Sequence, residues 1–401
     1  MTRSRRALLG GLAALLVLSA SLHVALLLTT TGASADLDNY HSQAFAVTHA
    51  VNVYRFVPNG YPYPPVWIWI MWLLAGLSHH GVPFAIAVKL PATVADLGII
   101  VLLFWHEVRL HGWQSGALAA AALWALNPIA AVIAAGHGQF DAVPIFFMVL
   151  AVLLIARGDM RSRMLASLAL GLAIALKGYP VVLLPYLVFT TPRGRRLAAT
   201  GLALAPVLAA MAVYVLAAGF SPAMITHVVG YQSVQDLGLS AVLHNFTPIT
   251  LSRTGQLVLT VVAADLFVFW ALTQSRLHPS RAELGAAALF AMFYLVTPRG
   301  SIQYLVWGLP FFVLAFRRLA LAFTIAGTAL MVGFYSLIFS GALPGNVSAL
   351  PGGQWFYLLG LVGVLVVSAG CVVESWRRRE GAQAAGATLA RKSGYAFSPN
   401  Q

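Results

Sequence analysis

The 401-residue sequence is poor in charge, and above all in acid. Charged residues make up 9% of it, against about 25% in a typical soluble protein. Only 11 residues are Asp or Glu, whereas 24 are Lys or Arg. Hydrophobic residues account for 60% of the chain, which indicates a protein that lies in a membrane.

The sequence also lacks most of the motifs that announce a common chemistry. A single cysteine, Cys371, excludes an intramolecular disulfide and a cysteine-based zinc site. There is no phosphate-binding loop, no HExxH and no CxxC motif, and no Gly-x-Ser-x-Gly nucleophile elbow. These absences argue against an ATP-driven pump and the common hydrolases.

What the sequence has is a series of apolar segments, many of them near the ~20 residues needed to cross a ~30 Å hydrocarbon core. They predict an all-α polytopic membrane protein with one membrane domain, residues 1–376, and a polar cytoplasmic tail, 377–401, that we expect to be disordered. The segments lie near residues 7–30, 64–78, 84–105, 115–134, 142–156, 164–176, 180–190, 198–218, 256–273, 284–297, 302–316, 319–340 and 354–375.

Arginine clusters predict how these segments are oriented. With the N-terminus in the cytoplasm, 18 of the 24 basic residues fall on the cytoplasmic side, as the positive-inside rule requires. The net charge of +13 is then explained without a nucleic-acid partner. Both basic ends prefer the cytoplasm, so one segment, 64–78 or part of 84–105, must fail to cross. We therefore expect about twelve crossings of the inner (plasma) membrane.

The first outer loop holds two acids, Asp36 and Asp38, in the stretch "DLDNY". Either could simply cap a helix that begins near Asn39, and their spacing also resembles a metal-binding Asp-x-Asp. The following residues, Tyr40 to Tyr54, are apolar at helical spacing, which predicts a helix lying in the membrane interface. "YPYPP", containing Tyr63, then leads into the next segment.

Two further outer stretches carry polar groups at membrane depth. "GHGQFDAVP" contains His137, Gln139 and Asp141, and charges there mark functional sites by default. The alternative is an ordinary turn in which Asp141 caps the next helix. "ALKGYPVVLLP" places Lys177 where it can meet a lipid phosphate, or where it only extends toward the head groups.

A fourth polar break, "PRGSIQYLVWGLP", contains Arg299, Gln303 and Tyr304. Arginine suits bidentate phosphate recognition. The alternative is a loop arginine among lipid head groups. The outer loops, 31–63 and 219–254, are also longer and richer in acid and base groups than the cytoplasmic turns, so we expect the active face outside.

Taken in order, "DLDNY", "YPYPP", "GHGQFDAVP", "ALKGYPVVLLP" and "QYLVWGLP" resemble the GT-C superfamily of membrane glycosyltransferases. The resemblance is to glycosyltransferase family 87 and to bacterial relatives of GPI-anchor mannosyltransferase II, and it covers roughly residues 1–316. It implies a GT-C-like bundle that uses a polyprenyl-phosphate sugar, most often mannose, on the outer face of the membrane. The acceptor would be a glycolipid or a glycan, and the configuration would invert.

The resemblance also implies roles for these residues. Asp36 or Asp38 would be the general base, and Asp36 lies where the family usually shows its acid. Fixed cations and donors would stabilise the departing phosphate, so we expect no metal and no cofactor. The substrate-binding candidates are Tyr63, His137, Gln139, Asp141, Lys177, Arg299, Gln303 and Tyr304.

A transporter or lipid flippase is the alternative function. Lys89, Asp96 and Asp265 lie inside apolar segments, where charges often line transport pathways. Transporter folds tend to show internal repeats with paired broken helices, and no such repeat is evident in the sequence.

Overall fold

The structure is a computed structural model that describes residues 3–57, 60–229, 236–249, 251–278, 281–338, 343 and 350–393. Over these ranges the regular structure is helical, and Leu237 and Gly300 form an isolated antiparallel β-bridge. Helices satisfy all of their backbone hydrogen bonds within one segment, which hydrocarbon surroundings require.

The described helices, in chain order, include three 3₁₀ helices and one π-helix, η1. They are α1 (Arg3–Thr29), α2 (Ser34–Thr48), α3 (Val53–Phe56), α4 (Val66–His79), α5 (Phe84–Ala87), α6 (Leu90–His111), α7 (Ser115–Ala125), α8 (Pro128–Ala131), η1 (Val132–His137), α9 (Ala142–Ile155), α10 (Met160–Leu176), η2 (Tyr179–Leu183), α11 (Leu184–Thr190), η3 (Arg193–Arg195), α12 (Arg196–Ala218), α13 (Pro222–Val229), α14 (Leu239–Phe246), α15 (Arg253–Leu277), α16 (Ala282–Val296), η4 (Ile302–Val306), α17 (Leu309–Ala315), α18 (Arg317–Leu337) and α19 (Gly353–Ser393).

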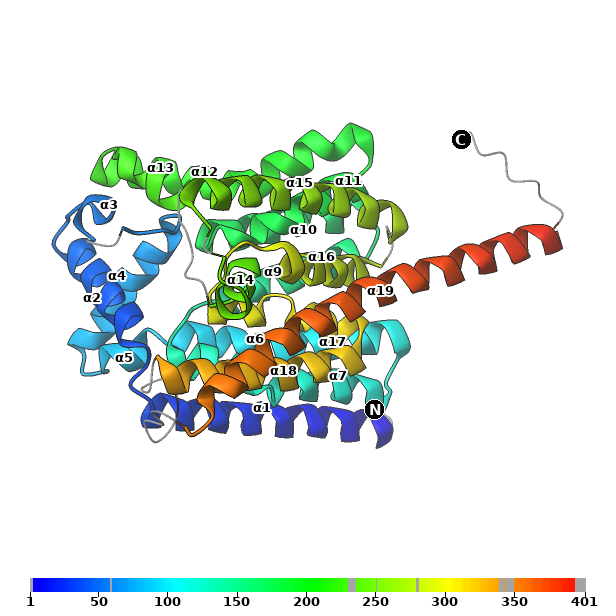
Figure 1. Cartoon of the computed structure of the whole chain (residues 1–401), viewed down its shortest axis with the longest axis horizontal. Helices are drawn as coiled ribbons and strands as arrows, with labels where there is room; N and C mark the ends of the chain where they lie inside the picture. The colour runs from blue at the N-terminus through cyan, green and yellow to red at the C-terminus, as the bar shows by residue number, and fades with distance from the viewer. Residues whose placement is uncertain are drawn as a thin grey trace.

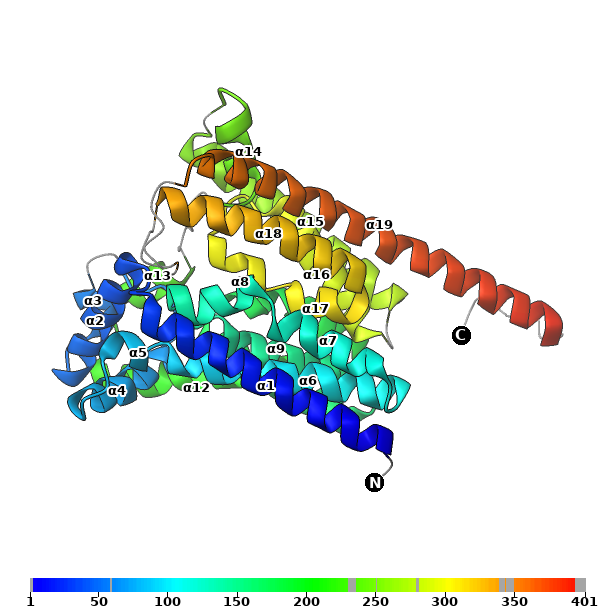
Figure 2. The same ribbon diagram turned by 90° about the horizontal axis from the view of Figure 1, so that it is seen from below.

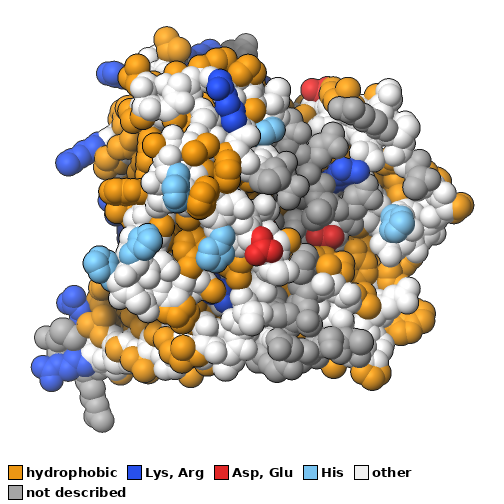
Figure 3. All heavy atoms as spheres, turned by 90° about the vertical axis from the view of Figure 1, so that its left-hand side faces the viewer, with side chains coloured by type: hydrophobic (Ala, Val, Ile, Leu, Met, Phe, Trp, Pro, Cys, Tyr) orange, Lys and Arg blue, Asp and Glu red, His pale blue; other side chains and the backbone are white. Residues whose placement is uncertain are grey.

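The long helices run along one direction and give the molecule two distinct ends. The N-terminus lies at the right-hand end in Figure 1, and α19 leaves the bundle at the same end. The short helices α2 to α5 and α13 gather at the opposite end, and Figure 2 shows the same separation. Figure 3 views this second end and shows histidine and acidic side chains across its middle.

Six of the described helices are long and apolar enough to cross a membrane, and the pair Ser115–Ala125 and Pro128–His137, bent by 43°, makes up to seven. The structure thus confirms an all-helical chain with several helices able to span a membrane. Five shorter apolar helices of 10–17 residues accompany them among the described residues. The expected total of about twelve crossings stays a prediction.

The first loop folds differently from the expected helix over Tyr40–Tyr54. Helix α2 starts earlier, at Ser34, and ends at Thr48, after which Ala50 adopts a left-handed conformation with φ 55°. A short helix, α3, follows from Val53. Whether these helices lie in the membrane interface stays a prediction. At the other end of the chain, α19 is helical to Ser393, within the segment for which the sequence predicts a disordered tail.

Two hydrophobic cores meet beside the polar stretch 136–141, between η1 and α9. The larger core joins residues of α1, α6, α7, α9, α10 and α16 to α18. The smaller core holds α2 to α5 together and includes Phe140, whose ring stacks on Trp67 at 3.8 Å. Phe140 therefore fixes the group of short helices against the bundle, between Gln139 and Asp141.

Asp96, one of the charges that suggest a transport pathway, has structural partners. The ring of His23 in α1 lies 2.9 Å from an oxygen of Asp96 in α6, and the indole N–H of Trp124 in α7 donates to the other oxygen at 3.0 Å. All three side chains are buried. This cluster fastens three helices together, which explains Asp96 without a transport role.

Helices α18 and α19 pack through glycines. A Cβ on Gly333 would collide with the backbone of Tyr357, and one on Gly360 would collide with the backbone of Leu330. Small residues of this kind let two helix backbones approach closely within a membrane. The contact holds α18 in place, and α18 carries Tyr335, which belongs to the candidate site.

Candidate active site

Helix α2 presents Asp36 from its first turn. The residue before the helix is Ala33, whose N–H donates to the carbonyl of His137 at 3.0 Å. The start of α2 is thereby tied to the end of the π-helix. Asp36 is the third helical residue, and its carboxylate accepts hydrogen bonds from side chains rather than from the backbone. The interpretation of Asp36 as a helix cap is therefore wrong.

Asp36, His137 and Tyr335 form a hydrogen-bonded chain. Nε2 of His137 lies 2.6 Å from Oδ2 of Asp36, and Nδ1 of His137 lies 2.5 Å from the hydroxyl of Tyr335. An ionised carboxylate only accepts, so Nε2 must carry a proton. On its other side, Nδ1 hydrogen-bonds to the tyrosine hydroxyl, which fixes the orientation of the imidazole.

The local backbone brings His137 and Gln139 onto the same carboxylate. The π-helix ends at His137, and Gly138 follows with a left-handed φ of 95°. A Cβ at Gly138 would lie 3.3 Å from Cε of Lys89, so both conformation and space favour glycine. The amide nitrogen of Gln139 then donates to Oδ2 of Asp36 at 2.9 Å.

A second buried carboxylate, Asp141, lies beyond Gln139. Its Oδ2 pairs with Nζ of Lys177 at 2.8 Å, and its Oδ1 accepts from the indole N–H of Trp307 at 2.6 Å. Asp141 precedes α9, but its side chain makes no capping hydrogen bond. The alternative of a simple helix cap is wrong here too, because the tertiary fold gives both carboxylate oxygens other donors.

Gln139 connects the two carboxylate centres. Its amide oxygen accepts from Nζ of Lys177 at 3.3 Å and from the hydroxyl of Tyr40 at 3.2 Å, while its amide nitrogen serves Asp36. The resulting network runs from Tyr335 to Trp307. Its members come from α2, η1 and α18, and from the residues that directly follow η1, α10 and η4. Lys177 also lies over the rings of Tyr63 and Phe140, at 5.1 and 4.8 Å.

The Asp36 carboxylate remains ionised in this setting. Burial opposes ionisation, but the hydrogen bond and charge of His137 outweigh it, aided by the amide of Gln139. The charge of Lys177 acts in the same direction, and the pKa of Asp36 lies below its ordinary value. Its side chain is 33% exposed. Within the described part of the chain, Oδ1 of Asp36 has no hydrogen-bond partner.

Asp38 lies on the other side of α2. Two residues of an α-helix are separated by about 200° around its axis, so Asp36 faces the network and Asp38 is exposed. The two carboxylates therefore do not converge on one ligand as an Asp-x-Asp pair would. Within the described residues, no group of three or more His, Cys, Asp or Glu side chains is placed to hold a metal.

The candidates of the fourth motif divide between two places. Tyr304 stacks on Trp307 at 3.7 Å and so borders the Asp141 centre. Gln303 is buried and accepts from the Ser301 hydroxyl. Arg299 lies in the adjacent loop, where its carbonyl accepts from Thr297 at 2.9 Å.

Asp236, in the loop 219–254, is an acid that the sequence did not indicate as a site residue. Its backbone N–H donates to Gly300 at 3.0 Å, and its carboxyl lies 3.5 Å from the Ser301 hydroxyl. Tyr335 and Trp307 were also missed as site residues. Trp307 stood within a quoted motif, whereas Tyr335 lies in an apolar segment that gave no signal.

Asp236 predicts a pH dependence of stability. Burial raises its pKa to about 7, against the opposing effects of the Ser301 hydroxyl and the His137 charge. The folded chain therefore binds more protons than the unfolded chain between the ordinary value of about 4 and 7, and stability falls as the pH rises through that window. We expect Asp236→Asn to remove this dependence. The melting temperature of Asp236→Asn minus that of the wild type should therefore rise from pH 5 to pH 8.

The same comparison with Asp38→Asn, which changes an exposed carboxylate, should give no such trend. A constant difference between Asp236→Asn and the wild type over this pH range would contradict the assignment.

A helical membrane chain that brings a partly exposed carboxylate, a hydrogen-bonded histidine and a buried lysine into one network has the groups from which an enzyme site can be built. The comparison with known families is more specific: the model of glycosyltransferase family 87 matches residues 61–298, more than half of the chain. The chain belongs to glycosyltransferase family 87. The match includes Tyr63, His137, Gln139, Asp141 and Lys177. No curated protein matches the sequence.

Proposed function

We propose that this glycosyltransferase moves a hexose, mannose foremost, from a polyprenyl monophosphate to a hydroxyl of a glycolipid or glycan. Asp36 is the general base. The observation that carries the proposal is the state of its carboxylate: Oδ2 is held by His137 and Gln139, while Oδ1 has no partner within the described residues, on a side chain that is partly exposed. A base held in this way is oriented before the acceptor arrives.

In the proposed reaction, Oδ1 of Asp36 takes the proton of the acceptor hydroxyl. The hydroxyl oxygen attacks the anomeric carbon from the face opposite the phosphate, and the bond from that carbon to the phosphate oxygen breaks. The electron pair leaves with the polyprenyl phosphate, and the configuration inverts. The proton then passes to water from the partly exposed carboxyl group of Asp36, whose Oδ2 keeps its hydrogen bonds from His137 and Gln139.

Lys177 is the proposed stabiliser of the departing phosphate. It is almost fully buried, and Asp141 fixes its position. Its charge can therefore stabilise the departing phosphate with little reorganisation of the protein. Both oxygens of Asp141 already have donors, so we propose that Asp141 positions Lys177 instead of binding sugar. Tyr63, Arg299, Gln303 and Tyr304 complete the proposed substrate contacts.

A groove on the apolar flank supports a lipid-linked donor. It has a volume of about 630 Å³ and lies between α4, α9, α10 and α12. Its wall includes Leu176, the residue before Lys177, and Val143, two residues after Asp141. Every residue that lines it is apolar, which suits a polyprenyl chain whose phosphate lies beside Lys177.

Filling this groove should weaken the donor's lipid contact. Ala209 is exposed and lines the groove, so Ala209→Phe places a ring in it without disturbing buried packing. We expect the KM for a long-chain polyprenyl-phosphate sugar to rise about tenfold, the equivalent of roughly two buried CH₂ groups. The KM for a donor with only two isoprene units should stay unchanged.

Leu208→Phe is the matched control for this variant. Leu208 is 60% exposed on the same helix but does not line the groove. Equal KM changes in both variants, or for both chain lengths of donor, would rule out the groove as the polyprenyl site.

We further propose about twelve crossings, with the site on the outer side of the plasma membrane. The apolar helices support this: among the described residues six are long enough to cross, the bent pair of α7 with α8 and η1 makes a seventh, and shorter apolar helices such as α9 and α16 accompany them. Helix α4 instead packs with α2 and α5 at one end, which fits the segment 64–78 that we expect not to cross. The arginine clusters lie at the end that carries the N-terminus.

The test of the function is transfer by purified full-length protein in detergent. Polyprenyl-phosphate [¹⁴C]mannose and a membrane lipid extract should yield a labelled lipid or glycan, whereas GDP-[¹⁴C]mannose alone should not. Transfer from the nucleotide sugar in the absence of a polyprenyl phosphate would refute the proposed donor. Glucosyl and arabinosyl donors in parallel would identify the sugar.

A further inference from the structure

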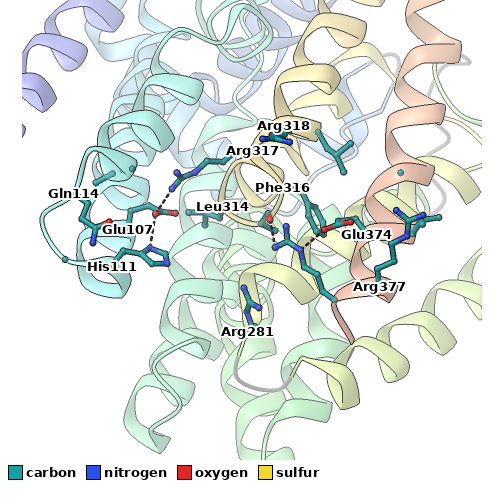
Figure 4. A pocket seen from close by; sticks show the side chains of 18 residues that line it. Glu107, His111, Gln114, Arg281, Leu314, Phe316, Arg317, Arg318, Glu374 and Arg377 are labelled. Atoms are coloured by element: carbon teal, nitrogen blue, oxygen red, sulfur yellow. Dashed lines mark hydrogen bonds and ion pairs between the residues drawn. The ribbon is translucent and has the colours of Figure 1, made fainter. Parts of the chain in front are cut away.

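The end of the bundle opposite the candidate active site contains a second hollow. It is a cavity of about 930 Å³ between the C-terminal ends of α6 and α17, the N-terminal ends of α7 and α18, and the middle of α19. Figure 4 shows Glu107 and His111 on one side, Glu374 and Arg377 on the other, and Arg281 below. Cavities of roughly 300–1,000 Å³ are the usual size for small-molecule sites.

The lining of this cavity is strongly cationic. It includes five arginines, Arg281, Arg317, Arg318, Arg377 and Arg378, but only two acids, Glu107 and Glu374. The surplus is three positive charges. In a concave site the field of such charges is concentrated, which attracts an anion.

Both acids are already neutralised by partners within the wall. Buried Glu107 pairs with Arg317 at 2.5 Å and with His111 at 3.1 Å. Glu374 pairs with Arg378 at 2.9 Å, and a second nitrogen of Arg378 donates to the carbonyl of Ala315. These contacts hold two arginines as parts of the wall.

Three guanidinium groups are left over. The ion pair of Arg281 with Glu283 is long, at 3.8 Å, and the Arg281 side chain is 58% exposed. Arg318 and Arg377 are exposed, and among the side chains that the structure describes none forms an ion pair with either. They come from different elements, and Figure 4 shows them on different sides of Phe316.

The position of Arg317 and Arg318 at a helix N-terminus also favours the binding of an anion. They occupy the first turn of the 21-residue helix α18. The N-terminal end of a helix carries partial positive charge and free backbone N–H groups, so cations there are unfavourable and anions are favourable. A bound phosphate would relieve this repulsion.

Apolar side chains complete the wall. Leu314, Phe316, Leu319 and Val373 line the cavity together with the arginines. An anionic head group with an acyl chain matches both kinds of surface, whereas a free phosphate uses only the cationic part. Anionic lipids are also concentrated at the membrane surface that arginine-rich loops face.

We propose that this cavity is a binding site for a phosphate group carried by an anionic membrane lipid, separate from the site of sugar transfer. Arg281, Arg318 and Arg377 contact the phosphate, and the apolar wall receives the start of the acyl chains. The proposal depends on the charge and shape of this end alone, and it holds whichever sugar or donor the enzyme uses.

The test measures lipid binding to the detergent-purified full-length chain by native mass spectrometry. The probes are phosphatidylglycerol, zwitterionic phosphatidylcholine, and inorganic phosphate as a competitor. We expect Arg318→Gln with Arg377→Gln to weaken phosphatidylglycerol binding about tenfold or more, at roughly 1 kcal/mol per arginine. Phosphatidylcholine binding should not change.

The matched control is Arg193→Gln with Arg195→Gln, two exposed arginines at the same end that do not line the cavity. Melting temperatures establish that both double variants fold. Selective loss in the cavity variant supports the proposal. Displacement of the lipid by millimolar inorganic phosphate also supports a phosphate site, but makes a soluble phosphate the ligand. Equal loss in both double variants, or no preference for phosphatidylglycerol over phosphatidylcholine, would overturn it.

Discussion

Asp36→Asn is expected to lower kcat for sugar transfer by about 10²- to 10⁴-fold, the usual contribution of a general base. The amide keeps the size of the carboxylate and an oxygen that can still accept from His137 and Gln139, so the fold around it should persist. What is lost is the ability to take a proton from the acceptor. The measurement is initial rates with a labelled polyprenyl-phosphate sugar in detergent, together with the melting temperature of each variant.

Asp38→Asn is the matched control, because the two acids lie in the same turn of α2 and face different sides. It should transfer sugar within about twofold of the wild type, as expected for an exposed surface substitution. Loss of activity in Asp38→Asn with retention in Asp36→Asn would reverse the assignment. Full activity in both, and in the double variant, would remove the first outer loop from the mechanism.

The pH profile offers a further check on Asp36. Its pKa is lowered, so the carboxylate stays ionised through neutral pH. Activity should therefore not fall because of Asp36 protonation as the pH drops from 8 to 5. An acid limb in that range must come from another group.

The second large effect is expected at the Lys177–Asp141 pair. Lys177→Met leaves a fully buried Asp141 with the Trp307 N–H as its only side-chain donor among the described residues. Removing one partner of a buried ion pair typically costs about 3–5 kcal/mol of stability, because the remaining charge is left uncompensated. The single variant should therefore show a strongly lowered melting temperature and poor yield.

A double variant separates stability from chemistry. Lys177→Met combined with Asp141→Asn removes both charges, and it should recover most of the lost stability, since an uncharged pair of similar volume is often neutral. Activity should remain low, because the cation proposed to meet the departing phosphate is still missing. Recovered activity in the double variant would show that Lys177 serves the fold alone.

Most of the candidate site was visible in the sequence because it is local. "GHGQFDAVP" brings His137, Gln139 and Asp141 within five residues, and Gly138 between them permits the left-handed turn that this arrangement needs. Lys177 stood at a helix end marked by Gly178 and Pro180, and α10 does end at Leu176. Polar residues that interrupt an apolar pattern are few, so each one is informative.

Which side chains meet could not be predicted in this way. Tyr335 reaches His137 across 198 residues, and Trp307 reaches Asp141 across 166. Both lie in segments whose hydropathy resembles that of any buried helix. The choice between Asp36 and Asp38 also needed the actual start of α2, since a shift of two residues turns a helical side chain to the opposite face.

The sequence alone determined that the chain is helical and membrane-bound, and it indicated which stretches carry polar chemistry. The hydrocarbon core of a membrane requires each segment separately to be helical and apolar, because each must be long enough to cross and must satisfy every backbone hydrogen bond. The tertiary structure decided how those stretches combine: Gln139 links Asp36 to Lys177, Asp141 pairs with Lys177, and arginines from different helices line one cavity. These contacts depend on how helices pack against one another, which is a property of side-chain shape across the whole bundle and not of any single segment.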